Sequence, residues 1–118
     1  MLSGAVISEC GKYRYSLTRE WVNGPRVMLA MLNPSTADAL VDDPTIRRCV
    51  SFAMRWEWRG LKFGSLEVVN LFAFRATDPK DMAAAKANGV DIVGSENDRH
   101  IIEAASRASL VVAAWGAD

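Results

Sequence analysis

The chain has 118 residues, which is long enough to bury a core and too short for more than one domain. Half of the residues are hydrophobic and 24% are charged, which excludes a disordered chain and a coiled coil. Because 14 Lys and Arg residues balance 14 Asp and Glu residues, the chain as a whole is not drawn to nucleic acid or to an anionic membrane. Any contact with a polyanion has to come from a local patch.

The two cysteines, Cys10 and Cys49, are far apart and lack the spacing of a metal site, which predicts reduced thiols. His100 is the only histidine, which argues against a histidine-based zinc site. No apolar stretch approaches the length of a membrane span, and the first residues lack a basic leader. We therefore expect a cytoplasmic domain without a cofactor, a metal or a membrane partner.

The first predicted strand covers residues 13–21, where alternate residues fall on one face and the other face is more polar. Asn23 and Gly24 follow, a pair that tolerates positive φ and predicts the tip of an antiparallel hairpin. Val27–Leu32 is apolar at every position, which predicts a second strand that is covered on both faces.

Three helices are predicted. Two begin at Asp-Pro pairs, in which the aspartate caps the helix and proline takes its first position: one starts at Asp43 and runs to about Trp56, and a short one starts at Asp78. The third follows a capping-box-like stretch at Ser95 and runs to about Ala108.

Two more apolar runs, Leu66–Leu71 and Leu110–Trp115, alternate with these helices. Strands separated by helices are joined by right-handed crossovers, so we expect them to be parallel to each other and to Val27–Leu32. The prediction is a single α/β domain over residues 1–118, with three α/β/α layers and a mostly parallel sheet preceded by an N-terminal antiparallel hairpin.

Ligands of open parallel sheets bind beyond the carboxyl ends of the strands. Polar residues occur there after two of the predicted strands, and we expect Asn33, Ser35, Asn70 and Arg75 to meet in one accessible cleft. An amide offers both a donor and an acceptor, which suits reading the edge of a nucleobase or holding a water. The alternative is that the two asparagines only bond the turning backbone.

Two other clusters suggest different chemistry. Arg47 and Arg48 belong to a locally basic stretch that could meet phosphates, although a solvated helix face is the simpler interpretation. Asp38 and Asp42 would suit a metal-dependent hydrolase if they do not merely solvate their loop.

Three strings closely resemble the bacterial and phage family catalogued as domain of unknown function 1643: LNPSTAD, DDPTIRRC and NLFAFRATDP, which start at Leu32, Asp42 and Asn70. A more distant resemblance is to the uracil-DNA glycosylase superfamily. Leu32-Asn33-Pro34 is similar to the motif by which some of its members position a water. The segment around Asn70 is similar to the strand-terminal motif that reads the base, and residues 112–116 are similar to its apolar strand ending in Trp-Gly.

This resemblance implies an α/β fold that takes a base of DNA, or a free nucleobase or nucleotide, at the carboxyl ends of the strands. Together with the residues at the strand ends, it leads us to expect catalytic roles for Asn33 and Ser35, and substrate contacts from Asn70, Phe72, Arg75 and Trp115. Either Phe72 or Phe74 could stack on a base, and core packing is the equal alternative for both.

The departures from that superfamily are also informative. Asn33 stands where the classical members carry a water-activating aspartate, and their C-terminal His-Pro segment has no counterpart before Asp118. We expect a chain that is truncated at its C-terminus and inactive or nearly so, with apolar area exposed near Trp115 or hidden by self-association. Two alternatives remain: a non-catalytic module that binds a nucleotide or a protein, and the metal-dependent hydrolase.

Overall fold

The computed structural model describes residues 1–34, 36–76 and 78–115. Its strands are β1 (Leu2–Ile7), β2 (Arg14–Glu20), β3 (Arg26–Met31), β4 (Glu57–Trp58), β5 (Leu61–Lys62), β6 (Ser65–Asn70) and β7 (Leu110–Ala113). Its helices are α1 (Pro44–Arg55), α2 (Pro79–Ala87) and α3 (Asn97–Arg107). In these described parts of the chain, no helix is long and apolar enough to cross a bilayer.

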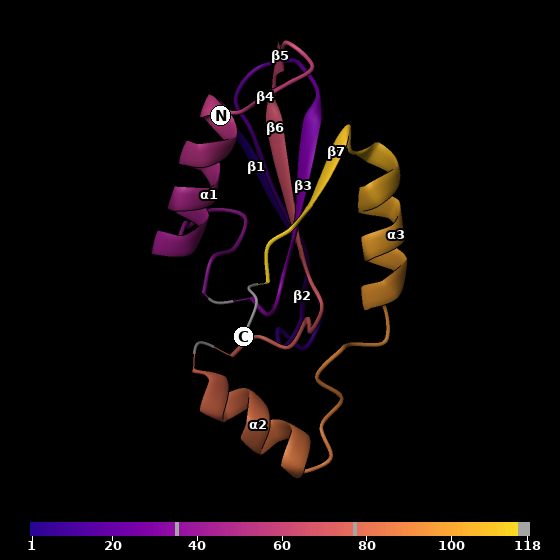
Figure 1. Cartoon of the computed structure of the whole chain (residues 1–118). Helices are drawn as coiled ribbons and strands as arrows, with labels where there is room; N and C mark the ends of the chain where they lie inside the picture. The colour runs from indigo at the N-terminus through magenta and orange to yellow at the C-terminus, as the bar shows by residue number, and fades with distance from the viewer. Residues whose placement is uncertain (35, 77, 116–118) are drawn as a thin grey trace.

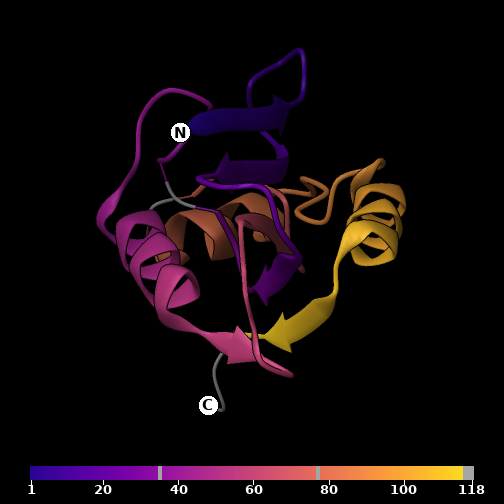
Figure 2. The same cartoon turned by 90° about the horizontal axis from the view of Figure 1, so that it is seen from above.

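Five strands form one sheet in the order β1-β2-β6-β3-β7. Strand β3 is parallel to both β6 and β7, whereas β2 is antiparallel to both β1 and β6, so four of the five strands share one direction. Helices α1 and α3 lie on opposite faces of the sheet, and α2 lies beyond its lower end (Figures 1 and 2). The predicted mostly parallel α/β fold and its three mutually parallel strands are therefore confirmed.

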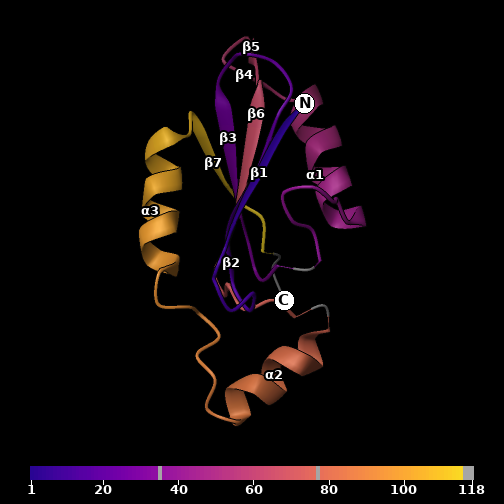
Figure 3. The ribbon, with the colours of Figure 1, turned by 180° about the vertical axis from the view of Figure 1, so that it is seen from behind.

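The N-terminal antiparallel hairpin is present, but it is formed by β1 and β2, which pair from Leu2 with Glu20 onward (Figure 3). The prediction that Asn23 and Gly24 form its tip is wrong, because β6 lies between β2 and β3. The connection between β2 and β3 instead folds around Gly64, which bonds the main chain of Trp21, Val22 and Pro25. A side chain at position 64 would collide with the Val22 carbonyl, so this approach requires glycine.

Strand β2 does not keep the predicted alternation. Ser16 pairs with Val6 and Arg14 pairs with Ile7, so Tyr15 has no partner on β1 and forms a bulge. The bulge turns Tyr15 toward α3, where its ring stacks on His100 at 5.1 Å. The predicted wetter face is also wrong, because β2 is an interior strand and Arg14 is only 2% exposed.

Each face of the sheet carries its own core. On the α1 side, residues of β2, β3 and β6 pack against α1: Leu17, Val27, Leu29, Leu66 and Val68 against Ile46, Val50 and Ala53. On the α3 side, a smaller cluster joins Met28, Ala30 and Val69 to Ala104. The small second cluster leaves part of that face to polar residues.

The predicted N-terminal caps are present in two of the three helices. Asp43 accepts from the Ile46 amide at 2.8 Å and Asp78 from the Lys80 amide at 2.9 Å, which confirms both predicted N-caps. The capping box predicted for α3 is wrong, since its N-cap is Glu96 and no side chain caps it. The neighbouring Asn97 is fully buried instead.

Strand β7 is an edge strand with one open face. Leu110 and Val112 pack on the α1-side core, whereas Val111 is 50% exposed. Helix α3 lies mainly over β2, β3 and β6, which leaves the other face of this apolar edge strand open. The expected exposure of apolar area near Trp115 is confirmed, with this residue 46% exposed.

Candidate functional site

The carboxyl ends of β3 and β6 meet at the lower edge of the sheet, and we call this region the strand-end edge (Figure 1). Beyond the strands the two chains remain side by side, because the Leu71 amide donates to the Met31 carbonyl and the Phe72 amide to the Leu32 carbonyl, both at 2.9 Å. As predicted, the residues that follow these two strands therefore lie at one edge.

Asn33 links the two loops of the strand-end edge. Its Nδ2 donates to the Ala76 carbonyl at 3.0 Å and to the Pro34 carbonyl at 3.3 Å. Both donors of the half-buried amide thus bond turning backbone, which was the structural alternative for this residue. Its Oδ1 remains as the atom that can accept a bond from a ligand or a water.

Asn70 ends the central strand β6 and is 1% exposed. Its Oδ1 accepts from Arg14 Nη2 at 3.5 Å, and Arg14 Nη1 donates to the Ala37 carbonyl at 3.0 Å. Arg14 thus holds the segment that contains Ala37 in place beside Asn70. Burial lowers the pKa of Arg14 to about 10, although the opposing charge of Asp43 raises it, so the guanidinium stays protonated at neutral pH.

Asn97 reaches the same place from the first turn of α3. Its Nδ2 donates to the Asn70 carbonyl at 2.8 Å and to the Leu71 carbonyl at 3.2 Å. Three side-chain atoms of this buried polar cluster, which consists of Arg14, Asn70 and Asn97, have no hydrogen-bond partner in the described structure: Arg14 Nε, Asn70 Nδ2 and Asn97 Oδ1. Buried polar atoms without partners are rare in natural proteins.

The other predicted residues are more accessible. Arg75 is half-buried and donates to the Gly11 carbonyl at 3.3 Å and to the Thr36 carbonyl at 3.5 Å. Phe72 is half-buried, Trp115 is partly exposed just past β7, and Ser35 lies outside the described residues. The structure therefore brings Asn33, Asn70 and Arg75 to one edge, whereas their opening into a shared cleft stays a prediction.

A family model described as "Protein of unknown function (DUF1643)" matches residues 14–118. The chain belongs to the DUF1643 family. No curated protein and no solved structure matches the chain. The match includes the whole strand-end edge and leaves out only β1 and the turn that follows it.

Sequence reasoning missed two members of the buried polar cluster of this DUF1643 chain. The sequence placed Arg14 on the more polar face of the first predicted strand, and Asn97 inside the capping-box-like stretch that begins at Ser95. The local pattern could not identify Arg14 as buried, because it begins β2 and its partners, the Ala37 carbonyl and Asn70, lie on distant segments.

Asp38 and Asp42, the candidates for a metal-dependent hydrolase, both have protein partners. Asp42 pairs with the buried Arg19 at 2.8 Å. Asp38 Oδ1 accepts from the Leu40 and Val41 amides, and these bonds hold the pKa of Asp38 below its usual value. Among the described residues, no group of three or more His, Cys, Asp or Glu side chains could hold a metal ion. The geometry gives the metal-dependent hydrolase no support.

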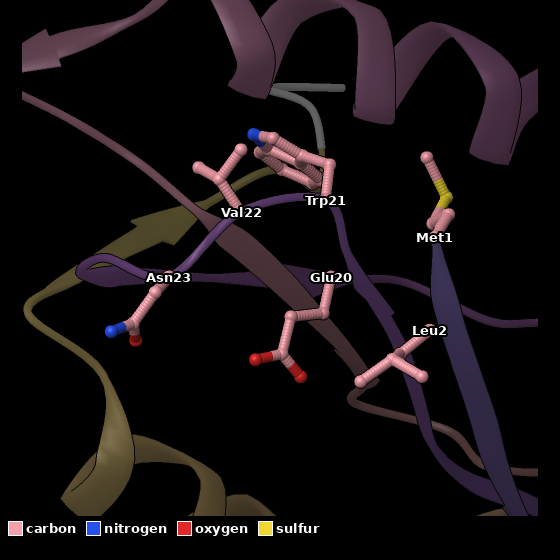
Figure 4. Close-up of a pocket in the computed structure, with 6 residues that line it drawn as sticks. All are labelled: Met1, Leu2, Glu20, Trp21, Val22 and Asn23. Atoms are coloured by element: carbon pink, nitrogen blue, oxygen red, sulfur yellow. The ribbon is translucent and has the colours of Figure 1, made fainter.

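Described residues also line two pockets elsewhere in the chain. One, of about 360 Å³, is at the opposite edge of the sheet and is lined by Met1, Leu2, Glu20, Trp21, Val22 and Asn23. In Figure 4 the Glu20 carboxylate and the Asn23 amide extend to one side of the chain and the Trp21 indole to the other, so the polar groups do not converge with the aromatic ring.

The other pocket, of about 450 Å³, lies between α3 and the β1–β2 hairpin. Its base holds Glu67, which is 1% exposed and accepts from Ser16 Oγ at 2.6 Å and from Arg107 Nη2 at 2.9 Å. Arg26 Nη1 lies 3.4 Å from the same carboxylate. Because Glu67 is already surrounded by partners, this network stabilises the fold without presenting a free group to a ligand.

Proposed function

We propose that this DUF1643 chain binds a nucleobase-bearing ligand, free or within DNA, at the strand-end edge, as a domain of glycosylase-like kind. The observation that carries the proposal is the amide of Asn70, which is 1% exposed and has no described partner for Nδ2. Leaving such a donor unpaired costs about 1–3 kcal/mol, which argues that Asn70 does more than hold backbone. An amide presents the paired donor and acceptor that match the edge of a base.

The accessible residues of the strand-end edge would meet the ligand first. Phe72 and Trp115 offer aromatic faces on which a base can stack, and Arg75 offers a cation for a phosphate or a carbonyl oxygen. Arg14 and Asp43 hold the segment around Ala37 through its carbonyl and its amide, and we propose that a shift of this segment exposes Asn70 to the ligand. Ligand binding therefore has to compete with these two bonds.

The residues of the strand-end edge favour binding of a ligand over catalysis of its hydrolysis. Glycosidic cleavage needs a positioned nucleophile and a group that takes its proton. Asn33 can position a water through Oδ1, but an amide cannot act as a general base. We therefore propose a positioning role for Asn33 and expect hydrolysis close to the uncatalysed rate.

The test is a titration of the chain with uracil, with 2′-deoxyuridine and with an oligonucleotide that contains an abasic site, followed by tryptophan fluorescence. Asn33→Ala should weaken binding about fivefold to tenfold, which is the loss of roughly one hydrogen bond. Asn23→Ala is the matched control, because Asn23 is an exposed asparagine at the opposite edge of the sheet.

Saturable binding that depends on Asn33 and not on Asn23 would support the proposal. No saturable binding of any of the three ligands, or equal losses in the two variants, would refute it.

The exposed edge of β7 supports a second candidate, a module that binds another protein chain, including a second copy of itself. Val111 is 50% exposed and Trp115 is 46% exposed, and an edge strand offers unpaired main-chain groups to a partner. Burying a tryptophan contributes about 2–3 kcal/mol, so a dimer needs neighbouring residues as well. Light scattering over a concentration series should show association that Trp115→Ser removes. A wild-type chain that stays monomeric throughout would contradict self-association.

A further inference from the structure

The charge of the chain is unevenly distributed along the sequence. Between Pro44 and Lys62 lie five of the fourteen basic residues and only one of the fourteen acidic residues, Glu57. This segment therefore carries a formal charge of +4, and the rest of the chain carries −4. It forms α1 and the β4–β5 hairpin, which lies at the end of the sheet opposite the strand-end edge (Figure 1).

This segment carries six exposed basic and aromatic side chains. Arg48, Phe52 and Arg55 are spaced i, i+4 and i+7 on α1, which puts them on one face, and all three are exposed. The β4–β5 hairpin, which follows α1 in the chain, carries three more exposed residues. Trp58 and Lys62 lie on opposite faces of this ribbon, because Trp58 pairs with Leu61 and Glu57 pairs with Lys62. We call these six the basic-aromatic surface: Arg48, Phe52, Arg55, Trp58, Arg59 and Lys62.

Two of the four cations of this surface lie against its rings. The Arg55 guanidinium is 5.2 Å from the centre of the Phe52 ring, and that of Arg59 is 5.4 Å from the Trp58 ring. Phe52 is still 48% exposed and Trp58 39% exposed. The ion pairs formed between described residues use arginines elsewhere in the chain, and none includes a cation of this surface.

Arg59 is also held in an unfavourable backbone conformation. Its φ is 52°, and it is the only non-glycine residue in the described structure with positive φ. Together with Gly60 at φ 79°, it forms the two-residue turn of the hairpin. Asparagine or glycine is normally preferred at such a position. An arginine there lowers the stability of the fold, which suggests that its side chain has another role.

We propose that the basic-aromatic surface binds single-stranded nucleic acid. Unpaired guanidinium and ammonium groups attract phosphates, and exposed rings stack on bases. Single strands present the faces of their bases, whereas a duplex keeps them stacked inside, so the aromatic residues favour the single strand. An acidic protein would satisfy the cations but would leave the role of the rings unexplained. This surface is separate from the strand-end edge, and the inference does not depend on the function proposed there.

The experiment measures fluorescence anisotropy of a labelled oligo-dT of about 15 nucleotides, and of a duplex of equal length, between about 50 and 200 mM salt. If the four cations each meet one phosphate, the logarithm of the association constant should fall against the logarithm of salt concentration with a slope of about −3. Oligo-dT should bind more tightly than the duplex.

Arg55→Glu/Arg59→Glu should weaken binding at least tenfold and reduce the slope by about 1.4, since each phosphate contact contributes about 0.7. The matched control is Lys80→Glu/Lys86→Glu on α2, which changes the net charge equally at two exposed positions and should bind within about twofold of wild type. Trp58→Ala should weaken binding about fivefold or more, and Trp58→Phe should restore most of it.

Four results would overturn the inference: no binding at the lowest salt, equal losses in the two double variants, tighter binding to the duplex, or full affinity after Trp58→Ala. Asn33→Ala separates this surface from the strand-end edge and should leave oligo-dT binding within about twofold of wild type. Loss of binding in Asn33→Ala but not in Arg55→Glu/Arg59→Glu would place the strand at the edge. That result would refute this inference and leave the proposed function standing.

Discussion

The strand-end edge and the basic-aromatic surface use polar side chains in opposite ways. At the edge, Arg14, Asn70 and Asn97 are at most 2% exposed and are bonded to backbone or to one another. On the outer surface, the cations are exposed and outside the ion pairs of the described structure. The edge therefore contributes to folding as well as to any binding, whereas the outer surface can be changed with little effect on folding.

The largest effect on stability is expected at Asp43, the first of the two Asp-Pro helix starts. Asp43 is 6% exposed, caps α1 and also accepts from the Ala37 amide at 3.1 Å. Asp43→Ala should lower the free energy of unfolding by about 2–4 kcal/mol, because it removes a cap and a bond to a charged, buried group. Asp78→Ala removes an exposed cap on α2 and should cost about 0.5–1 kcal/mol.

Urea unfolding of the two variants measures this difference. Equal losses would show that the edge is no more important to folding than the short exposed helix.

A smaller effect is expected from Asn97→Ala. The substitution leaves the Asn70 and Leu71 carbonyls without the donor that Asn97 supplies, and we expect a loss of about 2 kcal/mol in the free energy of unfolding. Asn23→Ala, at an exposed position, should change it by less than about 0.5 kcal/mol. Thermal unfolding of both variants is sufficient, and an Asn97→Ala chain as stable as wild type would mean that these carbonyls readily find other partners.

On the basic-aromatic surface, one substitution should raise the free energy of unfolding instead of lowering it. Arg55→Ala should leave the free energy of unfolding within about 0.5 kcal/mol of wild type. Arg59→Asn should raise it by several tenths to about 1 kcal/mol, because asparagine tolerates positive φ better than arginine. If the same variant binds oligo-dT more weakly, stability and binding oppose each other at this residue. A lower free energy of unfolding after Arg59→Asn would argue against backbone strain at the positive φ of Arg59.

The last prediction compares the accessibility of the two cysteine thiols, and its measurement requires no substitution in the core. A hydrogen bond from Ser8 lowers the pKa of the exposed Cys10 thiol, whereas burial raises the pKa of Cys49 on α1. Cys10 should therefore be alkylated first at neutral pH, since the thiolate is the reactive form. Mass spectrometry after brief iodoacetamide treatment gives the order, with Cys10→Ser as the control for the slow site. Comparable rates would show that α1 opens readily from the core.

Local signals predicted much of the architecture. The apolar runs of β3 and β6 and the Asp-Pro starts of α1 and α2 need only neighbouring residues, and all four were located correctly. The hairpin tip at Asn23 failed because β6 entered between β2 and β3, and this pairing joins residues far apart in the chain. The bulge at Tyr15 likewise depends on the register with β1.

The sequence by itself determined which residues follow the parallel strands, and so placed Asn33, Asn70 and Arg75 at one edge. Only the tertiary structure decided what those residues contact. Asn70 became buried because Arg14 crosses from β2 to hold the Ala37 carbonyl, and Asn97 reached it from α3. Likewise, the sequence determined the charge of α1 and the hairpin, but the fold decided that no acidic residue of the rest of the described chain forms an ion pair with those cations. Strand direction follows from chain connectivity, whereas burial and pairing depend on distant segments that meet only when the sheet and its helices assemble.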